Sequence, residues 1–206
     1  MAFNAYLLFH KDVRKNPGEG ICGESTSKPQ SECPTPNGAI EIQDYAFGVS
    51  MPVSASRSDG GGPTTGRANF DIFSCTKGID SATPFLVQYC CTGKNIPSIV
   101  LHLYRQGNPD VQGTPAGVIK YAMVVFQNCV ITKVAVSGSG EELPKESLEF
   151  NYGLSEYIYQ KTKKSDGTRD GNPIRSQGWS TVTNQIMGSK ADFLAWEPPD
   201  AVETSQ

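Results

Sequence analysis

Apolar and polar residues alternate along most of this chain with a period of two, the pattern of β-strands that bury one face. The alternation is clearest in four segments: 3–10, 40–50, 119–136 and 148–159. Stretches rich in glycine and proline separate these segments, and such stretches favour turns and loops. The sequence therefore predicts a mainly β fold whose strands are joined by turns.

Two of the β segments predict more specific features. Residues 119–136 are interrupted at Gln127 and Asn128, which predicts a long bent pair of strands or a hairpin. Further along the chain, the pattern around Trp179 and Val182 predicts a last strand over residues 178–185.

A single helix is predicted inside residues 69–104, between two strands. Thr83 is expected to cap it with its side chain, Pro84 to take the first helical position and Gly93 to end it. Apolar residues recur at helical spacing between these signals, and they are Phe85, Leu86, Tyr89 and Cys90. We therefore expect one short helix that buries one face, over about residues 83–92.

Length and charge limit the class of protein. The chain has 206 residues, which fits a single all-β domain, and its formal net charge is only −3. Its basic residues are scattered, so we expect no binding to nucleic acid. Residues 1–10 have no basic start and no small-residue cleavage site, so we interpret them as a first strand and not as a signal peptide. No apolar segment approaches the roughly 20 residues that span a bilayer, so we expect a cytoplasmic protein without membrane insertion.

The sequence offers little catalytic chemistry. Its two histidines, His10 and His102, lie within strand patterns, where a structural histidine is far commoner than a catalytic one. No nucleophile motif accompanies them. The paired carboxylates Glu141 and Glu142 lie in a glycine-rich turn that would leave them solvated. We therefore expect no enzymatic activity and no cofactor.

A glycine-rich segment, residues 56–68, partly imitates a phosphate-binding loop. Gly61 and Gly66 have the required spacing, but Arg67 and Ala68 replace the lysine and the hydroxyl residue that such loops use. A strand follows where the chemistry needs a helix N-terminus. We interpret the segment as a flexible loop or one that a partner orders.

The six cysteines contain no C-x-x-C pair, so a metal site is disfavoured. Four of them lie in or beside apolar elements, where cysteine is usually a small buried apolar residue: Cys75, Cys90, Cys91 and Cys129. Cys22 and Cys33 lie instead in the long polar segment 11–38. A disulfide between these two is a hypothesis for an oxidising compartment only.

The strand predicted over residues 40–50 has two unlike faces. Tyr45, Phe47 and Val49 form a bulky face that suits the core. The other face carries only small side chains, those of Ala46, Gly48 and Ser50. It is either an ordinary exposed face or a surface that another molecule approaches closely.

The order of several short motifs resembles the Hcp family, the ring-forming tube proteins of the bacterial type VI secretion system. The first group is the run 40–50, the glycines 60–62, Phe70-Asp71-Ile72-Phe73, then Lys77, Asp80, Thr83 and Pro84 before a short helix that ends at Thr92-Gly93-Lys94. The second group is Ser139-Gly140-Glu141, Pro144, Glu146, Leu148, Phe150, Tyr157, Asp166-Gly167 and Gly178-Trp179. The resemblance covers almost the whole chain, from Ala2 to about Gln185.

The resemblance implies a compact antiparallel β-barrel of two sheets with one flanking helix, formed by residues 1–187 as a single domain. Six copies would close into a ring, and rings would stack into a hollow tube that carries effector proteins in its lumen. A contractile sheath and a spike-tip protein would be its partners. The tube would assemble in the cytoplasm and be secreted to the extracellular space or a target cell without a cleaved signal peptide. The segments near 11–38 and 106–117 look enlarged relative to the family, and residues 188–206 form an acidic tail too short for a fused toxin.

In such a ring, the small residues Ala46, Gly48 and Ser50 are expected to face the lumen. The expected interface between subunits or rings consists of Ser58, Asp59, Gly60, Gly61, Gly62, Pro63, Arg67, Gln88 and Cys91. The last two lie on the outer face of the helix, beside Val87 and Thr92.

Two other classes of function stay open on the sequence. A monomeric β-sandwich could bind a carbohydrate on an aromatic platform of Tyr157, Tyr159 and Trp179. A hydrolase with a dispersed site is the third, and the two histidines without a nucleophile motif disfavour it. The mass of the protein in solution separates a six-copy ring from a monomeric module.

Overall fold

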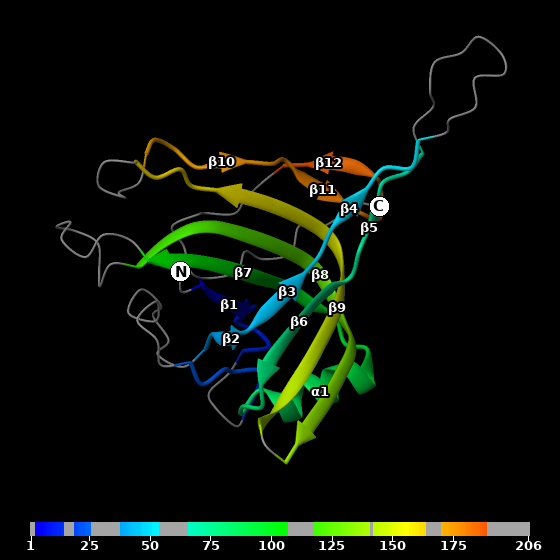
Figure 1. The fold of residues 1–206 in the computed structure, drawn as a ribbon. Coiled ribbons are helices and arrows are strands. Elements are labelled where there is room, and N and C mark those ends of the chain that lie inside the picture. Colours follow the sequence, from blue (N-terminus) through cyan, green and yellow to red (C-terminus); the bar gives the residue numbers. More distant parts are fainter. Residues whose placement is uncertain are drawn as a thin grey trace, which may run out of the picture.

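The computed structural model describes residues 3–14, 19–25, 38–53, 66–106, 118–140, 142–163 and 170–188. This part of the chain is mainly antiparallel β-sheet with one helix (Figure 1). Its elements are β1 (Phe3–Phe9), β2 (Ile40–Ile42), β3 (Asp44–Ala46), β4 (Val49–Ser50), β5 (Asn69–Phe70), β6 (Phe73–Gly78), α1 (Thr83–Thr92), β7 (Ile96–Gln106), β8 (Val118–Ser139), β9 (Glu142–Tyr159), β10 (Ile174–Arg175), β11 (Gly178–Ser180) and β12 (Gln185–Met187). The predicted mainly β fold with one short helix is confirmed.

The long hairpin of β8 and β9 is the centre of the sheet. On one side of it, β7 pairs with β8, β1 with β7 and β2 with β1. On the other side, β9 has different neighbours along its length. Its first half pairs with β6, and its second half pairs with β10 and β11. The single strand β9 therefore belongs to two diverging parts of the fold, as Figure 1 shows.

The sheet curves until its two sides approach each other at β2 and β3. β2 pairs with β1, whereas β3 pairs with β6, and between them the Gln43 N–H donates to the Thr76 carbonyl at 2.8 Å. No single strand in the described part pairs with both β1 and β6. The predicted barrel is therefore strongly curved but is not closed.

An aromatic cluster fills the concave side of the sheet. The rings of Phe73 and Phe150, which are paired across β6 and β9, stack with centroids 4.5 Å apart. Phe126 from β8 meets both rings edge-on, at 5.3 and 5.4 Å. Because such pairs add to the free energy gained by burial, these three residues tie the long hairpin to β6.

The interruption at residues 127–128 is a bend and not a turn. Residues 119–136 belong to the single strand β8, so the prediction of a pair or a hairpin within them is wrong. Asn128 has a positive φ of 54°, a conformation that asparagine tolerates better than most residues. The sequence located the bend correctly, but the chain continues in the same direction.

The helix α1 forms where the sequence predicts it, with Pro84 in its first turn. Gly93 ends it in the left-handed conformation, at a φ of 60°. The predicted cap is wrong, because Ala82 is the N-cap residue and Thr83 is already helical. Asp80 takes over part of that role, since its Oδ1 accepts from the Ala82 N–H at 3.0 Å. The predicted inner face packs on the core, with Leu86 fully buried.

A hairpin replaces the predicted last strand over residues 178–185. β11 and β12 pair with each other, and the turn between them contains Asn184 at a φ of 56°. The Ser180 carbonyl accepts from the Asn184 N–H at 3.0 Å, and Ser180 Oγ accepts from the Thr183 N–H at 3.1 Å. Val182 therefore lies exposed in a turn, because the strand residue Ser180 accepts hydrogen bonds from the N–H groups of Thr183 and Asn184.

Candidate functional site

The small residues predicted to face a lumen lie on the outside of the subunit. Ala46 and Ser50 are exposed and Gly48 is half-buried. On the opposite face, Tyr45 and Phe47 stack at 6.1 Å and pack on the core. Val49 is an exception to the predicted core face, since it is 63% exposed. The reason is that β4 has left the main sheet and pairs only with β5.

The strands β4 and β5 form a two-stranded arm, which we define as residues 47–53 and 66–72. Figure 1 shows it running away from the curved sheet. Three large apolar side chains on it are in contact with water, since Val49 is 63% exposed, Met51 48% and Val53 57%. Large apolar side chains that gather on an exposed surface are typical of interaction sites, so the arm is a candidate for one.

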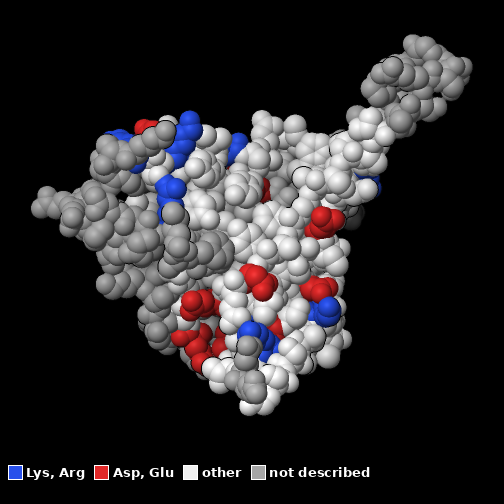
Figure 2. Space-filling model, in the orientation of Figure 1, with Lys and Arg blue, Asp and Glu red and all other residues white. Residues whose placement is uncertain are grey.

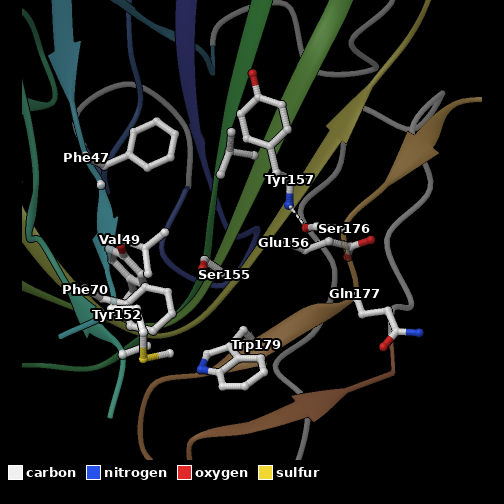
Figure 3. Close-up of a pocket in the computed structure, with 14 residues that line it drawn as sticks. Phe47, Val49, Phe70, Tyr152, Ser155, Glu156, Tyr157, Ser176, Gln177 and Trp179 are labelled. Atoms are coloured by element: carbon white, nitrogen blue, oxygen red, sulfur yellow. Dashed lines mark hydrogen bonds between the residues drawn. The ribbon is translucent and has the colours of Figure 1, made fainter. Parts of the chain in front are cut away.

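An open apolar pocket of about 430 Å³ lies between this arm and the main sheet. Its walls come from the arm on one side and from β11 with its preceding residues on the other, and β8 and β9 form the floor (Figure 3). The lining residues that the argument uses are Val49, Ala68 and Phe70 from the arm, Trp179 from β11, and Tyr152 and Glu156 from β9. Figure 3 shows Trp179 lying across the pocket from Val49 and Phe70.

Two buried polar atoms belong to residues that line this pocket. Among the described residues, neither Trp179 Nε1 nor Glu156 Oε1 has a hydrogen-bond partner. Glu156 is 3% exposed, and the same Oε1 forms an ion pair with Arg175 Nη1 at 3.6 Å, so only Trp179 Nε1 has neither a hydrogen bond nor an ion pair among the described residues. A pocket with apolar walls and a few polar groups has the composition of a binding site.

The aromatic platform proposed as an alternative is brought together only in part. Tyr157 and Trp179 both line the pocket, and Tyr159 does not. Figure 3 shows the rings of Tyr157 and Trp179 apart, on different sides of the pocket. The three rings therefore do not form one flat surface of the kind that stacks on a sugar.

Arg67, a predicted interface residue, contacts its own subunit. Its Nη2 donates to the Thr181 carbonyl and, at 2.8 Å, to the Val182 carbonyl. Both acceptors belong to the turn between β11 and β12. Sequence reasoning missed this contact because the partners are 114 and 115 residues apart.

The outer face of α1 carries the other described residues of the predicted interface. Gln88 and Cys91 are exposed, and Val87 beside them is 42% exposed. The prediction that Cys91 packs as a buried apolar residue is therefore wrong. For Cys75 and Cys129 it is confirmed, since both are buried. Burial raises the pKa of the Cys75 thiol to about 12 and that of the Cys129 thiol further.

The two histidines are structural, because His10 and His102 are both buried in the sheet region. Several predicted residues lie outside the described part of the chain, namely Ser58, Asp59, Gly60, Gly61, Gly62, Pro63, Cys33 and Glu141. A disulfide between Cys22 and Cys33 thus stays a prediction. In the described ranges, no cluster of histidine, cysteine and carboxylate residues could hold a metal ion. The one helix found there, with 10 residues, is too short to cross a membrane.

On the face shown in Figure 2, most basic side chains of the described residues gather toward the upper left, and most acidic ones gather toward the centre and lower part.

Comparison with known proteins agrees with the motifs. The sequence model of the family described as "Type VI secretion system effector, Hcp" matches residues 16–159, more than half of the chain. The chain belongs to the Hcp family. Protein hcp1 of Pseudomonas aeruginosa is 30% identical over 119 residues, which cover 57% of this chain and 68% of that protein. Members of this family are structural tube proteins of the type VI secretion system.

Solved structures share the fold of this Hcp chain. One is a type VI secretion system protein with a TM-score of 0.72 and 23% identity, covering 90% of this chain and all of that one. Another is Hcp1 from Salmonella typhimurium, with a TM-score of 0.61 and 22% identity, covering 91% of this chain and all of that one. These structures share the fold, and the match to the family's sequence model confirms the family predicted from the order of the motifs.

Proposed function

We propose that this chain is the ring-forming subunit of a type VI secretion tube, in which six copies close into a ring and rings stack into a hollow tube. The exposed apolar arm is the observation that carries the proposal. Val49, Met51 and Val53 would cost free energy in water, at about 25 cal/mol for each Å² of apolar surface, and a neighbouring subunit would remove that cost. The family to which the chain belongs supports the same reading.

The positions of the exposed surfaces favour a ring over a dimer with two-fold symmetry. Figure 1 shows α1 and the arm at opposite ends of the curved sheet. Contact between two unlike surfaces is head-to-tail, and head-to-tail contacts close into rings when the rotation allows it. In this arrangement Gln88 and Cys91 meet the arm side of the next subunit, and the loop with Ser58 to Pro63 contacts a neighbouring subunit or ring.

The small residues Ala46, Gly48 and Ser50 face the lumen in this proposal. A face without large side chains leaves the channel open for effector proteins. Their backbone lies on the outside of the subunit core, which supports this placement. A contractile sheath around the tube and a spike-tip protein at its end are the further partners, and the sheath drives the tube with its spike out of the cell.

A monomeric binding module is the alternative. The apolar pocket with Tyr157 and Trp179 favours it, because it has walls and polar atoms suited to a ligand. The two functions predict different oligomeric states. A binding module would be a monomer at every concentration, whereas a tube subunit would form rings.

Native mass spectrometry of arm variants tests the proposed function. Val49→Asp and Met51→Asp should prevent rings, because each places a charge on the apolar surface that the neighbour covers. Val136→Asp is the matched control, since Val136 is 55% exposed near the other end of β8 and does not line the pocket. Rings of unchanged mass and stability in both arm variants would contradict the proposal.

A further inference from the structure

The arm is attached to the sheet at its base through the backbone. The Asp71 N–H donates to the Gly48 carbonyl at 2.9 Å. This hydrogen bond joins the two segments of the arm where it leaves the sheet. The Tyr152 hydroxyl from β9 then donates to the Asp71 carbonyl at 3.0 Å. A Cβ at Gly48 would lie 2.6 Å from Asp71 Oδ2, so a larger residue there would push the exposed Asp71 side chain aside.

Arg67 provides a second attachment, away from the base. It donates to the carbonyls of Thr181 and Val182 in the turn after β11. That turn is itself fixed to β9, because the Thr181 N–H donates to the Gly153 carbonyl at 2.8 Å and Thr181 Oγ1 to the Tyr152 carbonyl at 2.9 Å. The arm is therefore held by hydrogen bonds at two points, one of which is a single exposed side chain, and its Phe47 and Phe70 also pack on the core.

This second attachment lies beside the apolar pocket and links the two segments that form its facing walls. Ala68 and Phe70, one and three residues after Arg67, line one wall, and Gln177 and Trp179, which precede the turn, line the other. No other side-chain hydrogen bond between these two walls occurs in the described residues. Arg67 thus supplies the side-chain hydrogen bonds between the two walls, and the ring of Phe70 against Tyr152 holds the arm wall to β9.

We propose that Arg67 is a clasp that keeps the apolar pocket narrow in the free subunit, and that its release lets the arm move and a neighbouring copy of the chain enter the pocket. The inference rests on the proposed function, because the neighbour is a second subunit of the ring. It adds regulation to that site. Arg67 first loses its hydrogen bonds to the Thr181 and Val182 carbonyls. The arm then moves away from β11 about its base at Gly48 and Asp71, which widens the pocket. The neighbouring subunit finally buries the exposed apolar side chains of the arm.

The contact needs arginine and would not be made equally well by lysine. Its acceptors are neutral carbonyls, so the clasp does not depend on the titration of a partner. A guanidinium presents several donors in a planar fork and reaches two carbonyls at once, whereas a lysine ammonium is a point charge on a flexible stem. Arg67→Lys should therefore open the pocket almost as much as Arg67→Ala does.

The test measures access to the pocket in single subunits and assembly in the same variants. The chain has two tryptophans, so Trp196→Phe leaves Trp179 as the only reporter. In this background, Arg67→Ala and Arg67→Lys should raise acrylamide quenching of Trp179 and bis-ANS affinity about three- to tenfold, the size expected for losing exposed charge-assisted hydrogen bonds. The control, Arg105→Ala, removes the same charge from β7 and should change neither quantity.

Each outcome decides the inference. Faster ring assembly together with greater access to Trp179 supports the clasp. Unchanged access in both Arg67 variants overturns it, and slower assembly with unchanged access overturns it in favour of Arg67 as a direct interface residue. If the parent protein stays monomeric at all concentrations, the proposed function fails, while the quenching and bis-ANS measurements still decide whether Arg67 narrows the pocket.

Discussion

Lys77 Nζ lies 3.3 Å from Glu146 Oε2, and both side chains are completely buried. The same ammonium contacts Asp80 Oδ1 at 2.9 Å, and the Thr83 hydroxyl donates to Glu146. The network therefore connects β6, β9 and the start of α1. All four residues belong to the motifs by which the sequence resembles the Hcp family, and their contacts give a physical reason for their occurrence together.

Removing the charge of Glu146 should destabilise the subunit strongly. Glu146→Gln leaves the buried Lys77 ammonium with Asp80 as its carboxylate partner, and breaking a buried ion pair typically costs about 3 kcal/mol or more. Urea unfolding of dilute protein measures the loss. The matched control is Glu149→Gln on the same strand, whose partner Lys133 is 53% exposed, so its loss should stay below about 1 kcal/mol. Equal losses in the two variants would contradict this role of the network.

Cysteine alkylation should distinguish buried thiols from the exposed one on α1. At pH 8, iodoacetamide should modify Cys91 in the free subunit and leave Cys75 and Cys129 unmodified, which peptide mass spectrometry detects. If α1 contacts the next subunit, ring formation should slow the modification of Cys91. Equal rates for Cys91 in rings and in free subunits would exclude it from the interface.

The raised pKa of Cys75 also predicts how stability changes at alkaline pH. Its thiol has an ordinary pKa of 9.0 when unfolded and about 12 when folded, because burial disfavours the thiolate. The folded state therefore holds the proton more tightly, and the contribution to stability is complete below about pH 9 and declines toward pH 12. In the Cys75→Ala variant, the free energy of unfolding should therefore fall less steeply as the pH rises from about 9 to about 12. An identical slope in the variant would show that Cys75 is not a source of the pH dependence.

A large charged residue at position 46 should leave ring formation intact and reduce the retention of effector proteins in the ring. Ala46→Glu places a carboxylate on the small face proposed to line the lumen. Co-purification of effector proteins with rings measures retention, and native mass spectrometry checks the rings. Ala135→Glu, at an exposed alanine of β8, is the control. Unchanged cargo retention in Ala46→Glu would contradict the assignment of this face to the lumen.

Deleting residues 56–65 should weaken ring closure or stacking. The deletion keeps β4, β5 and Arg67, so it tests the loop separately from the clasp. Native mass spectrometry reports ring closure, and electron microscopy of concentrated protein reports stacking. If rings and stacks form as readily as in the parent protein, the loop does not contact a neighbouring subunit or ring.

Local signals in the sequence predicted much of the fold. Pro84 and Gly93 locate α1 because each has a conformational requirement that depends on few neighbours. The alternation through residues 148–159 predicted β9 for the same reason, since the period of two is a property of one strand. The order of the motifs was specific enough to predict the family.

The candidate site could be predicted only in part, because tertiary pairing decides it. Alternation placed Val49 on the core face, but it could not show that β4 leaves the sheet. Nothing local connects Arg67 with the turn at Val182, or Trp179 with the arm. The buried charges of Lys77 and Glu146 were noted as part of a motif, yet their mutual contact depends on the pairing of β6 with β9.

The central claim is that this chain assembles into a six-copy ring, and native mass spectrometry of the purified protein tests it most directly, with electron microscopy of the same sample. The account predicts a particle of six chains that appears as a hollow ring. A protein that remains a monomer across the accessible range of concentration, with no rings in the images, would contradict it and favour the monomeric binding module.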